Sequence, residues 1–176
     1  MITERIPRPV AGEYAPFYAG YVAEVPDGDV LALLERQGRE TFDLLSALPE
    51  DRGAHRYAPE KWAIKDLAGH LADSERIFSY RALRFARGDE RPLQGFDEND
   101  YVRSAMALRR PLVEIARELH VVRQATVALF GGFAPEALAR SGTANDARVT
   151  VRALAWIIAG HERHHVRILH ERYLTG

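Results

Sequence analysis

The chain has 176 residues, of which 47 % are hydrophobic and 28 % charged, and its 24 lysines and arginines nearly balance 25 aspartates and glutamates. This length suits a single hydrophobic core, so we expect one domain over residues 1–176. The net charge of -1 gives no indication of a strongly basic surface, and we therefore expect no nucleic-acid partner. Because the chain contains no cysteine, disulfides, thiolate metal ligands and a cysteine nucleophile are also excluded.

The first 26 residues are rich in proline and aromatic side chains and lack the apolar stretch of a signal peptide. We expect residues 1–26 to form an arm without a regular helix, packed on the domain. The longest apolar stretch, around residues 154–159, is too short to span a bilayer. We therefore expect no membrane association and a cytoplasmic location.

Apolar side chains recur at helical spacing in four later segments. The predicted helices begin near Asp27 or Asp29, at Ala63, after Pro111 and at Thr150, and they end before Pro49, at Arg87, at Gly131 and near Leu174.

The segments between these helices are long in two places. Residues 88–109 are predicted to form a connection with one short helix over residues 97–106, and residues 133–149 to form a loop. No segment alternates with a period of two, so no strand is expected. This pattern predicts an all-α fold, a four-helix bundle with long inter-helix connections that need not run up-down-up-down.

Three histidines are predicted to face the interior of this bundle. His161 and His165 lie ~40° apart around the last helix, because each residue advances the helix by ~100°. Their face is also the apolar face of that helix, and His70 lies on the apolar face of the second helix. The apolar neighbours are Leu154, Ile157, Ile158 and Ile168 around the pair, and Leu67, Leu71 and Phe78 around His70.

Burying these imidazoles without partners would be unfavourable, and one metal ion would satisfy all three. We therefore predict a single divalent transition metal bound by His70, His161 and His165, with zinc or nickel preferred and iron or manganese as alternatives. Three protein ligands leave coordination positions open, as in catalytic sites. A single core-facing histidine is more often structural, and His164 could replace one member of the pair.

The run from His161 to His165 also matches the metalloprotease motif H-E-x-x-H, in which the glutamate acts as general base. The context argues against a protease, because only 11 residues follow His165 and the extended motif is not continued. Glu162 would lie ~100° from the ligand face, which weakens it as a base.

A different resemblance covers nearly the whole chain. The run YAPEKWAIKDLAGHLADSER, which contains His70, and the run GHERHH, which contains the pair, resemble signatures of the DinB/YfiT-like family of metalloenzymes. Ala63 departs from the pattern, since family members often carry Ser or Thr there to cap the helix. The other matching segments are residues 81–89, 95–101, 141–144 and 151–154.

The resemblance implies a four-helix bundle with one metal at the same three histidines and, commonly, a homodimer. Family members of known activity include transferases and isomerases that use bacillithiol, mycothiol or glutathione. Our leading hypothesis is therefore a metal-dependent transferase that joins a low-molecular-weight thiol to a small-molecule substrate. The alternatives are a metal-dependent hydrolase at the same site and a non-catalytic, metal-binding stress-response protein.

Further candidates are side chains near the predicted ligands. Glu162, Arg163 and Arg76 are candidates for a catalytic role, and Asp73 and Glu75 could orient a ligand imidazole. The arginines available to hold a substrate carboxylate are Arg76, Arg81, Arg163 and Arg167.

Overall fold

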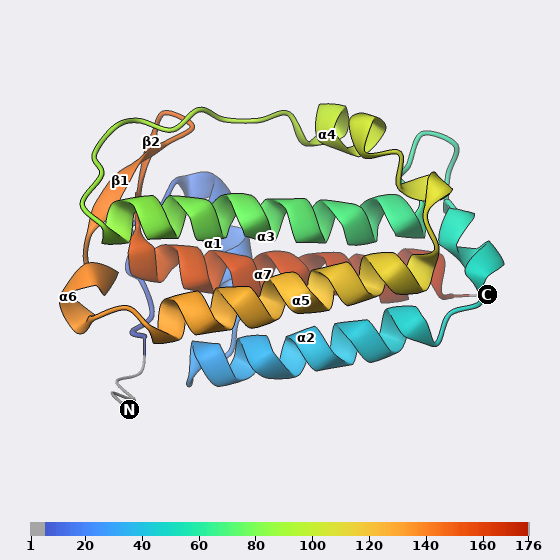
Figure 1. The fold of residues 1–176 in the computed structure, drawn as a ribbon, viewed down its shortest axis with the longest axis horizontal. Helices are drawn as coiled ribbons and strands as arrows, with labels where there is room; N and C mark the ends of the chain where they lie inside the picture. Colours follow the sequence, from blue (N-terminus) through green and yellow to red (C-terminus); the bar gives the residue numbers. More distant parts are fainter. Residues whose placement is uncertain (1–5, 176) are drawn as a thin grey trace.

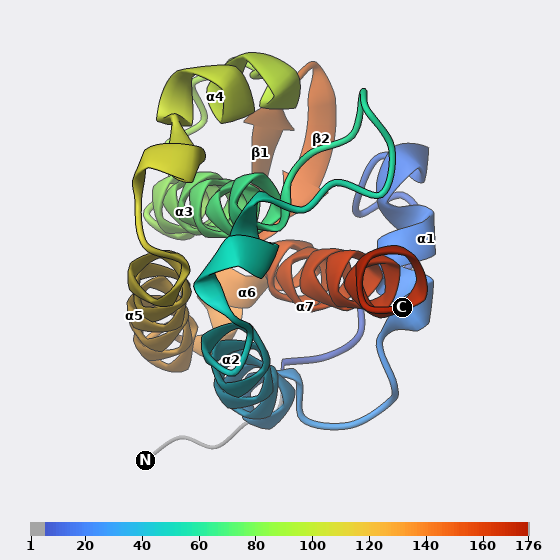
Figure 2. The same ribbon diagram turned by 90° about the vertical axis from the view of Figure 1, so that its right-hand side faces the viewer.

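The computed structural model describes residues 6–175 and confirms the all-α bundle (Figure 1). Viewed along its axis, the bundle places four long helices at the corners of a square (Figure 2). Each contacts two of the others, so α2 and α3 lie diagonally opposite. The four helices are α2 (Val30–Ser46), α3 (Ile64–Ala86), α5 (Leu112–Gly131) and α7 (Val151–Ile168).

The directions in which the four long helices run explain why the connection after α3 is long. Figure 1 shows that α3 and α5 run in the same direction, whereas α2 and α7 run in the opposite one. The chain between α3 and α5 must therefore return along the length of the bundle. It does so across the outer side of α3, where it carries the short helix α4 (Glu98–Ala105) and a 3-10 turn (Ala107–Arg109).

The predicted helix starts are confirmed by their caps. The Asp29 carboxylate accepts hydrogen bonds from the backbone at the start of α2, and the Thr150 hydroxyl accepts one from Ala153 N at 3.2 Å. At Ala63, which has no capping side chain, Asp66 accepts a hydrogen bond of 2.9 Å from the Ala63 backbone N–H. This bond is one half of a capping box, and it holds the start of α3 in place.

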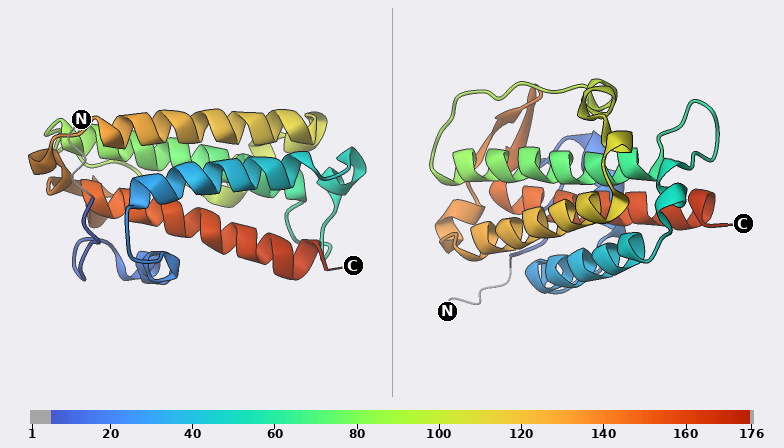
Figure 3. Two further views of the ribbon diagram at one scale, coloured as in Figure 1. Left: turned by 90° about the horizontal axis from the view of Figure 1, so that it is seen from below. Right: turned by 45° about the vertical axis from the view of Figure 1, so that its right-hand side comes forward.

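Two predictions about connecting segments are wrong. The arm contains regular structure, a 3-10 turn (Pro16–Tyr18) followed by α1 (Ala19–Glu24), which packs against α7 (Figure 3). Its residues 1–5 lie outside the described part of the chain. The segment 133–149, predicted as a loop, contains α6 (Pro135–Leu138) and β1 (Ser141–Ala144). It pairs β1 with β2 (Ala147–Thr150) in an antiparallel hairpin, so strands form where none was expected.

The hairpin follows from its turn rather than from alternation. Asn145 and Asp146 both have positive φ, 52° and 58°, as the two central residues of a tight hairpin turn require. With four residues in each strand, the segment is too short for period-two patterning to be recognised.

The last long helix, α7, ends at Ile168, and the chain continues from there as a π-helical turn (Leu169–Tyr173).

The hydrophobic core is divided into two clusters along the bundle axis. One contains Phe85, Phe130 and Trp156, and the other contains Leu112 and Leu169. Between them lies a layer of buried polar side chains from all four long helices: Gln37, Thr41, His70, Ser74, Glu75, Arg123, Thr126, His161 and Glu162. No helix of residues 6–175 is both long enough and apolar enough to cross a membrane.

Candidate metal centre

The three predicted histidines meet in this polar layer. The Nε2 atom of His161 lies 3.1 Å from Nε2 of His70, across the α3–α7 interface, and 3.1 Å from Nε2 of His165, one turn further along α7. One ligand nitrogen from each of the three lies within 4.8 Å of those of the other two. The structure therefore brings together residues 91 positions apart in the sequence, as the helical periodicity predicted.

Burial keeps these imidazoles neutral at neutral pH. It lowers the pKa of His70 to about 4, and burial together with the neighbouring His70 and His164 lowers the pKa of His165 to about 3. Burial, followed by the two neighbouring imidazoles, holds the pKa of His161 well below its usual range. Neutral imidazole is the form that binds a metal ion, because its unprotonated nitrogen offers a lone pair.

The spacing of the nitrogens fits a bound ion. Ligands at the usual ~2.0–2.1 Å from a tetrahedral ion lie roughly 3.3 Å apart, close to the two measured distances. Hydrogen bonds alone would satisfy the three nitrogens less well than a bound ion. Nε2 of His161 has only one proton or one lone pair, yet it faces the Nε2 atoms of both His70 and His165. The donor set, three imidazoles, suits zinc, nickel or another borderline transition metal.

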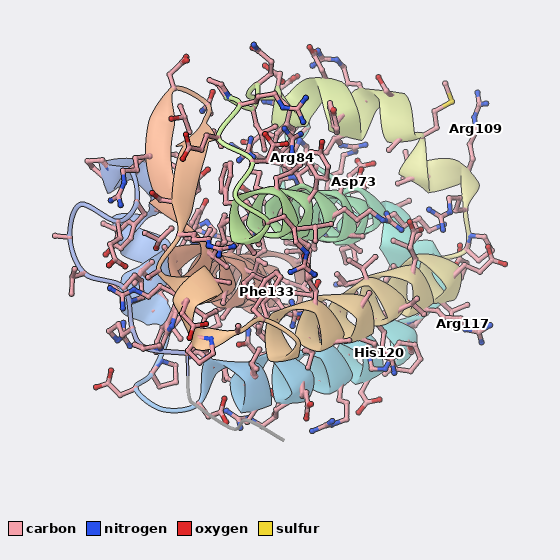
Figure 4. The ribbon with its side chains drawn as sticks, turned by 60° about the vertical axis from the view of Figure 1, so that its left-hand side comes forward. Asp73, Arg84, Arg109, Arg117, His120 and Phe133 are labelled. Atoms are coloured by element: carbon pink, nitrogen blue, oxygen red, sulfur yellow. The ribbon has the colours of Figure 1, made fainter. Side chains whose placement is uncertain are left out.

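His70 has one further polar neighbour. The Ser74 hydroxyl, one turn along α3, lies 3.4 Å from Nδ1 of His70. The two carboxylates suggested for orienting a ligand imidazole lie elsewhere: Asp73 pairs with Arg76, and Glu75 pairs with Arg123. Figure 4 shows Asp73 on the side of α3 that faces α4 rather than the bundle interior.

Glu162 points away from the histidines into the bundle core. Its Oε2 accepts hydrogen bonds from Arg123 at 2.6 Å and from Gln37 at 3.1 Å, and the residue is only 2 % exposed. Burial alone lowers the pKa of Arg123, but the carboxylates of Glu162 and Glu75 outweigh it and hold this pKa above its usual range. A carboxylate held in this way is not free to act as a general base at the metal.

The other charged candidates point away from the cluster, and His164 lies beside His165 without joining the group of three nitrogens. Arg163 donates to the backbone of Glu24, and Arg76 forms exposed ion pairs. His164 faces Glu24 and Arg167 rather than the three nitrogens.

Two hollows open beside the three histidines. The first, of about 320 Å³, is bordered by His70 and His161 and lies between α3, the arm and the connection that leads to α4. The second, of about 270 Å³, is bordered by His165 together with Trp62 and Tyr173. Glu98 and Asn99, at the start of α4, border both hollows.

Several aromatic residues around the site were not predicted. The ring of Trp62 lies 4.7 Å from that of His70 and stacks near that of His165, while its Nε1 donates to Asn99 at 3.2 Å. Tyr21 of α1 packs edge-on against His161, with ring centroids 5.4 Å apart. Trp62 lies within the quoted family signature, but the contribution of α1 depends on how the arm folds back, and local sequence does not reveal this.

Both the sequence and the fold of this chain are similar to those of known proteins. The family model of the DinB superfamily matches residues 33–169. A search of curated proteins gives no match. Among solved structures, the chain is similar to YfiT from Bacillus subtilis, a probable metal-dependent hydrolase with an unusual four-helix bundle topology, with a TM-score of 0.74, 17 % identity and 92 % of each chain covered. It is also similar to the mycothiol-dependent maleylpyruvate isomerase, with a TM-score of 0.65 and 15 % identity, covering 82 % of this chain and 61 % of that one.

Proposed function

This chain belongs to the DinB superfamily, and we propose that it is a metal-dependent transferase that uses a low-molecular-weight thiol as cosubstrate. His70, His161 and His165 would hold one divalent ion, zinc or nickel in preference to iron or manganese. Three protein ligands would leave room for further ligands on the ion, and both hollows border the cluster. When bound, such an ion lowers the pKa of a coordinated thiol or water and so supplies a nucleophile at neutral pH.

The observation that carries this proposal is the pair of hollows at one three-histidine cluster. A transfer reaction needs two small molecules side by side, and the first hollow borders His70 and His161 while the second borders His165. The N-terminal turn of α4 lies between them through Glu98 and Asn99. Because the chain has no cysteine, the thiol would have to come from a cosubstrate.

The chain's own residues would prepare the site in two ways. Burial keeps the three imidazoles neutral, so that protons do not compete for their nitrogens at neutral pH. Trp62 packs against His70 and Tyr21 packs against His161, and these two rings would limit access of water to the imidazoles.

A metal-dependent hydrolase is the second candidate, and the likeness to YfiT over 92 % of each chain favours it. The same three histidines would then hold an ion with bound water, and one hollow would suffice for the substrate. A non-catalytic metal-binding role is the third candidate.

Turnover assays separate these candidates. The zinc- or nickel-loaded protein would be mixed with a panel of electrophiles, each with and without glutathione, mycothiol or bacillithiol, and with His161→Ala as the control. Consumption of an electrophile that requires thiol and intact His161 would support the transferase. Cleavage without thiol would favour the hydrolase, and no turnover by a protein whose metal has a closed coordination shell would favour the non-catalytic role.

A small-molecule substrate is part of this proposal. Homodimerisation and a cytoplasmic location remain predictions from the sequence and the resemblance. Sedimentation of the purified protein would test the dimer.

A further inference from the structure

Arg81 is a buried cation with few partners. It lies on α3 and is only 4 % exposed, and its Nη2 donates to the Gln94 carbonyl at 3.2 Å. A guanidinium has five N–H donors in a rigid fork, so this one bond leaves most of them available. Within residues 6–175, no ion pair includes Arg81, whereas the other fully buried arginine, Arg123, pairs with two carboxylates.

The side chain of Arg81 borders the first hollow. His70, Ser74, Phe78 and Arg81 recur at helical spacing along one face of α3, and all four border this space. The opposite walls combine the aromatic rings of Phe17, Tyr18 and Phe96 with polar side chains, among them Asn99 and Asn145. A molecule in the hollow would therefore meet the histidines at one end, aromatic and polar side chains along its length, and a buried cation further along α3.

Two carboxylates of the chain itself, those of Asp97 and Glu98, also border this hollow. Asp97 caps α4 by accepting a hydrogen bond of 2.9 Å from Asp100 N. Glu98 also borders the second hollow beside His165, which places it toward the histidine end. Neither forms an ion pair with Arg81 among the described residues, so a carboxylate from outside the chain would be its first charged partner.

We propose that Arg81 binds a carboxylate of the substrate, and that the enzyme acts on elongated organic carboxylates whose reacting group lies at the three histidines. A planar guanidinium matches a carboxylate through two parallel hydrogen bonds. This inference rests on the proposed function and names the substrate class for the same site. Arg81 is a specificity-determining residue in this role.

The helix sets the length of such a molecule. Arg81 lies eleven positions after His70, which corresponds to about 16 Å between their Cα atoms at ~1.5 Å per residue. The arginine side chain leans back toward the N-terminus of α3 and shortens this span. The carboxylate and the reacting group are therefore expected at opposite ends of an extended molecule.

Binding of matched thiols tests this assignment. Cobalt-substituted protein would be titrated with ω-mercaptoalkanoates of three to eight carbons and with ω-mercaptoalcohols of the same lengths, and binding would be followed by thiolate-to-cobalt absorption. At the best length, we expect the carboxylate to bind about tenfold to a hundredfold more tightly than the alcohol. Arg81→Met should reduce this ratio to about one and leave the dissociation constant of the alcohol unchanged, whereas Arg81→Lys should keep part of the preference.

Arg117→Met is the matched control, because Arg117 projects from the outer face of α5 and does not border the hollow (Figure 4). Equal affinity for the two series in the unmodified protein would overturn the inference, as would a preference that survives in Arg81→Met. Absorption that responds to neither series would overturn the metal–thiol proposal itself and this inference with it. That result differs from equal binding of both series, so the two failures can be told apart.

Discussion

Arg123 of α5 donates to Oε2 of Glu162 on α7 at 2.6 Å, on the side of α7 that faces away from the histidine cluster. The same guanidinium donates to both carboxylate oxygens of Glu75 on α3, at 2.8 Å and 2.7 Å, and to the Leu34 carbonyl of α2. One side chain thus joins all four long helices in the layer that contains His70 and His161. This network fixes the register of α3 against α7, on which the distances between the imidazoles depend.

We expect Arg123→Met to destabilise the protein by about 3–5 kcal/mol, because it leaves two buried carboxylates without a cationic partner. Chemical denaturation would measure the loss. Arg36→Met is the matched control: Arg36 forms an exposed ion pair with Glu40 on α2, and its loss should cost no more than about 0.5 kcal/mol.

Glu162→Gln separates a structural role for this carboxylate from catalysis. Since Glu162 contacts Arg123 and Gln37 rather than the cluster, we expect a loss of about 1–3 kcal/mol in stability while bound metal and turnover are retained. A folded, fully metal-loaded variant with turnover reduced a hundredfold or more would show instead that Glu162 acts as a base.

Metal content should depend on His161 and not on its neighbour His164. His161 lies between the other two imidazoles, and we expect His161→Ala to reduce bound metal from about one ion per chain to a trace. His164→Ala should retain the full amount, because that side chain faces Glu24. Elemental analysis after dialysis would decide, and stoichiometric metal in His161→Ala would contradict the site.

The metal-free protein should lose stability in mild acid. The pKa of His70 is about 4 and that of His165 about 3 in the folded protein, below the ~6.5 of an unfolded chain. Below about pH 6.5, the unfolded chain therefore binds protons that the folded chain does not, so stability rises with pH and is fully present only above that value. We expect each of the two imidazoles to contribute a loss of about 2 kcal/mol between about pH 7 and 5.

Urea denaturation of chelator-treated protein across this range would measure the slope. His70→Gln should make it shallower, and His170→Gln should leave it unchanged, because His170 is exposed in the folded protein. A stability that stays constant from pH 7 to 5 would mean that the histidines are not buried in neutral form.

Gly160 allows α1 to lie close against α7. A Cβ at this position would overlap the backbone carbonyl of Tyr21, so we expect Gly160→Ala to destabilise the protein by about 1–3 kcal/mol and to displace α1. Gly20→Ala, on α1 itself, is the control: a Cβ there meets no other atom within 4 Å, and the change should be neutral or slightly stabilising. Equal stability of the two variants would contradict the tight approach of α1.

The sequence determined the features that depend on local periodicity and local capping. The positions of the four long helices follow from apolar spacing and from residues such as Asp29 and Thr150, whose side chains cap the nearest backbone N–H groups. The apolar face on which each imidazole lies is predictable for the same reason, since the position of a residue within a helix fixes its face. His70 therefore meets His161 and His165 as soon as the apolar face of α3 packs against the apolar face of α7.

Only the tertiary structure decided what lies around those three side chains. Short elements such as α1 and the β1–β2 hairpin are held by contacts with distant segments, so their local sequences carry too weak a signal to predict them. The partner of Glu162 is 39 residues away on α5, and nothing near it in the sequence indicates whether it faces the metal or Arg123. In the same way, Arg81 is one of four arginines that the sequence offers for a substrate carboxylate, but only the tertiary structure shows that Arg81 is buried and borders the same hollow as the histidines.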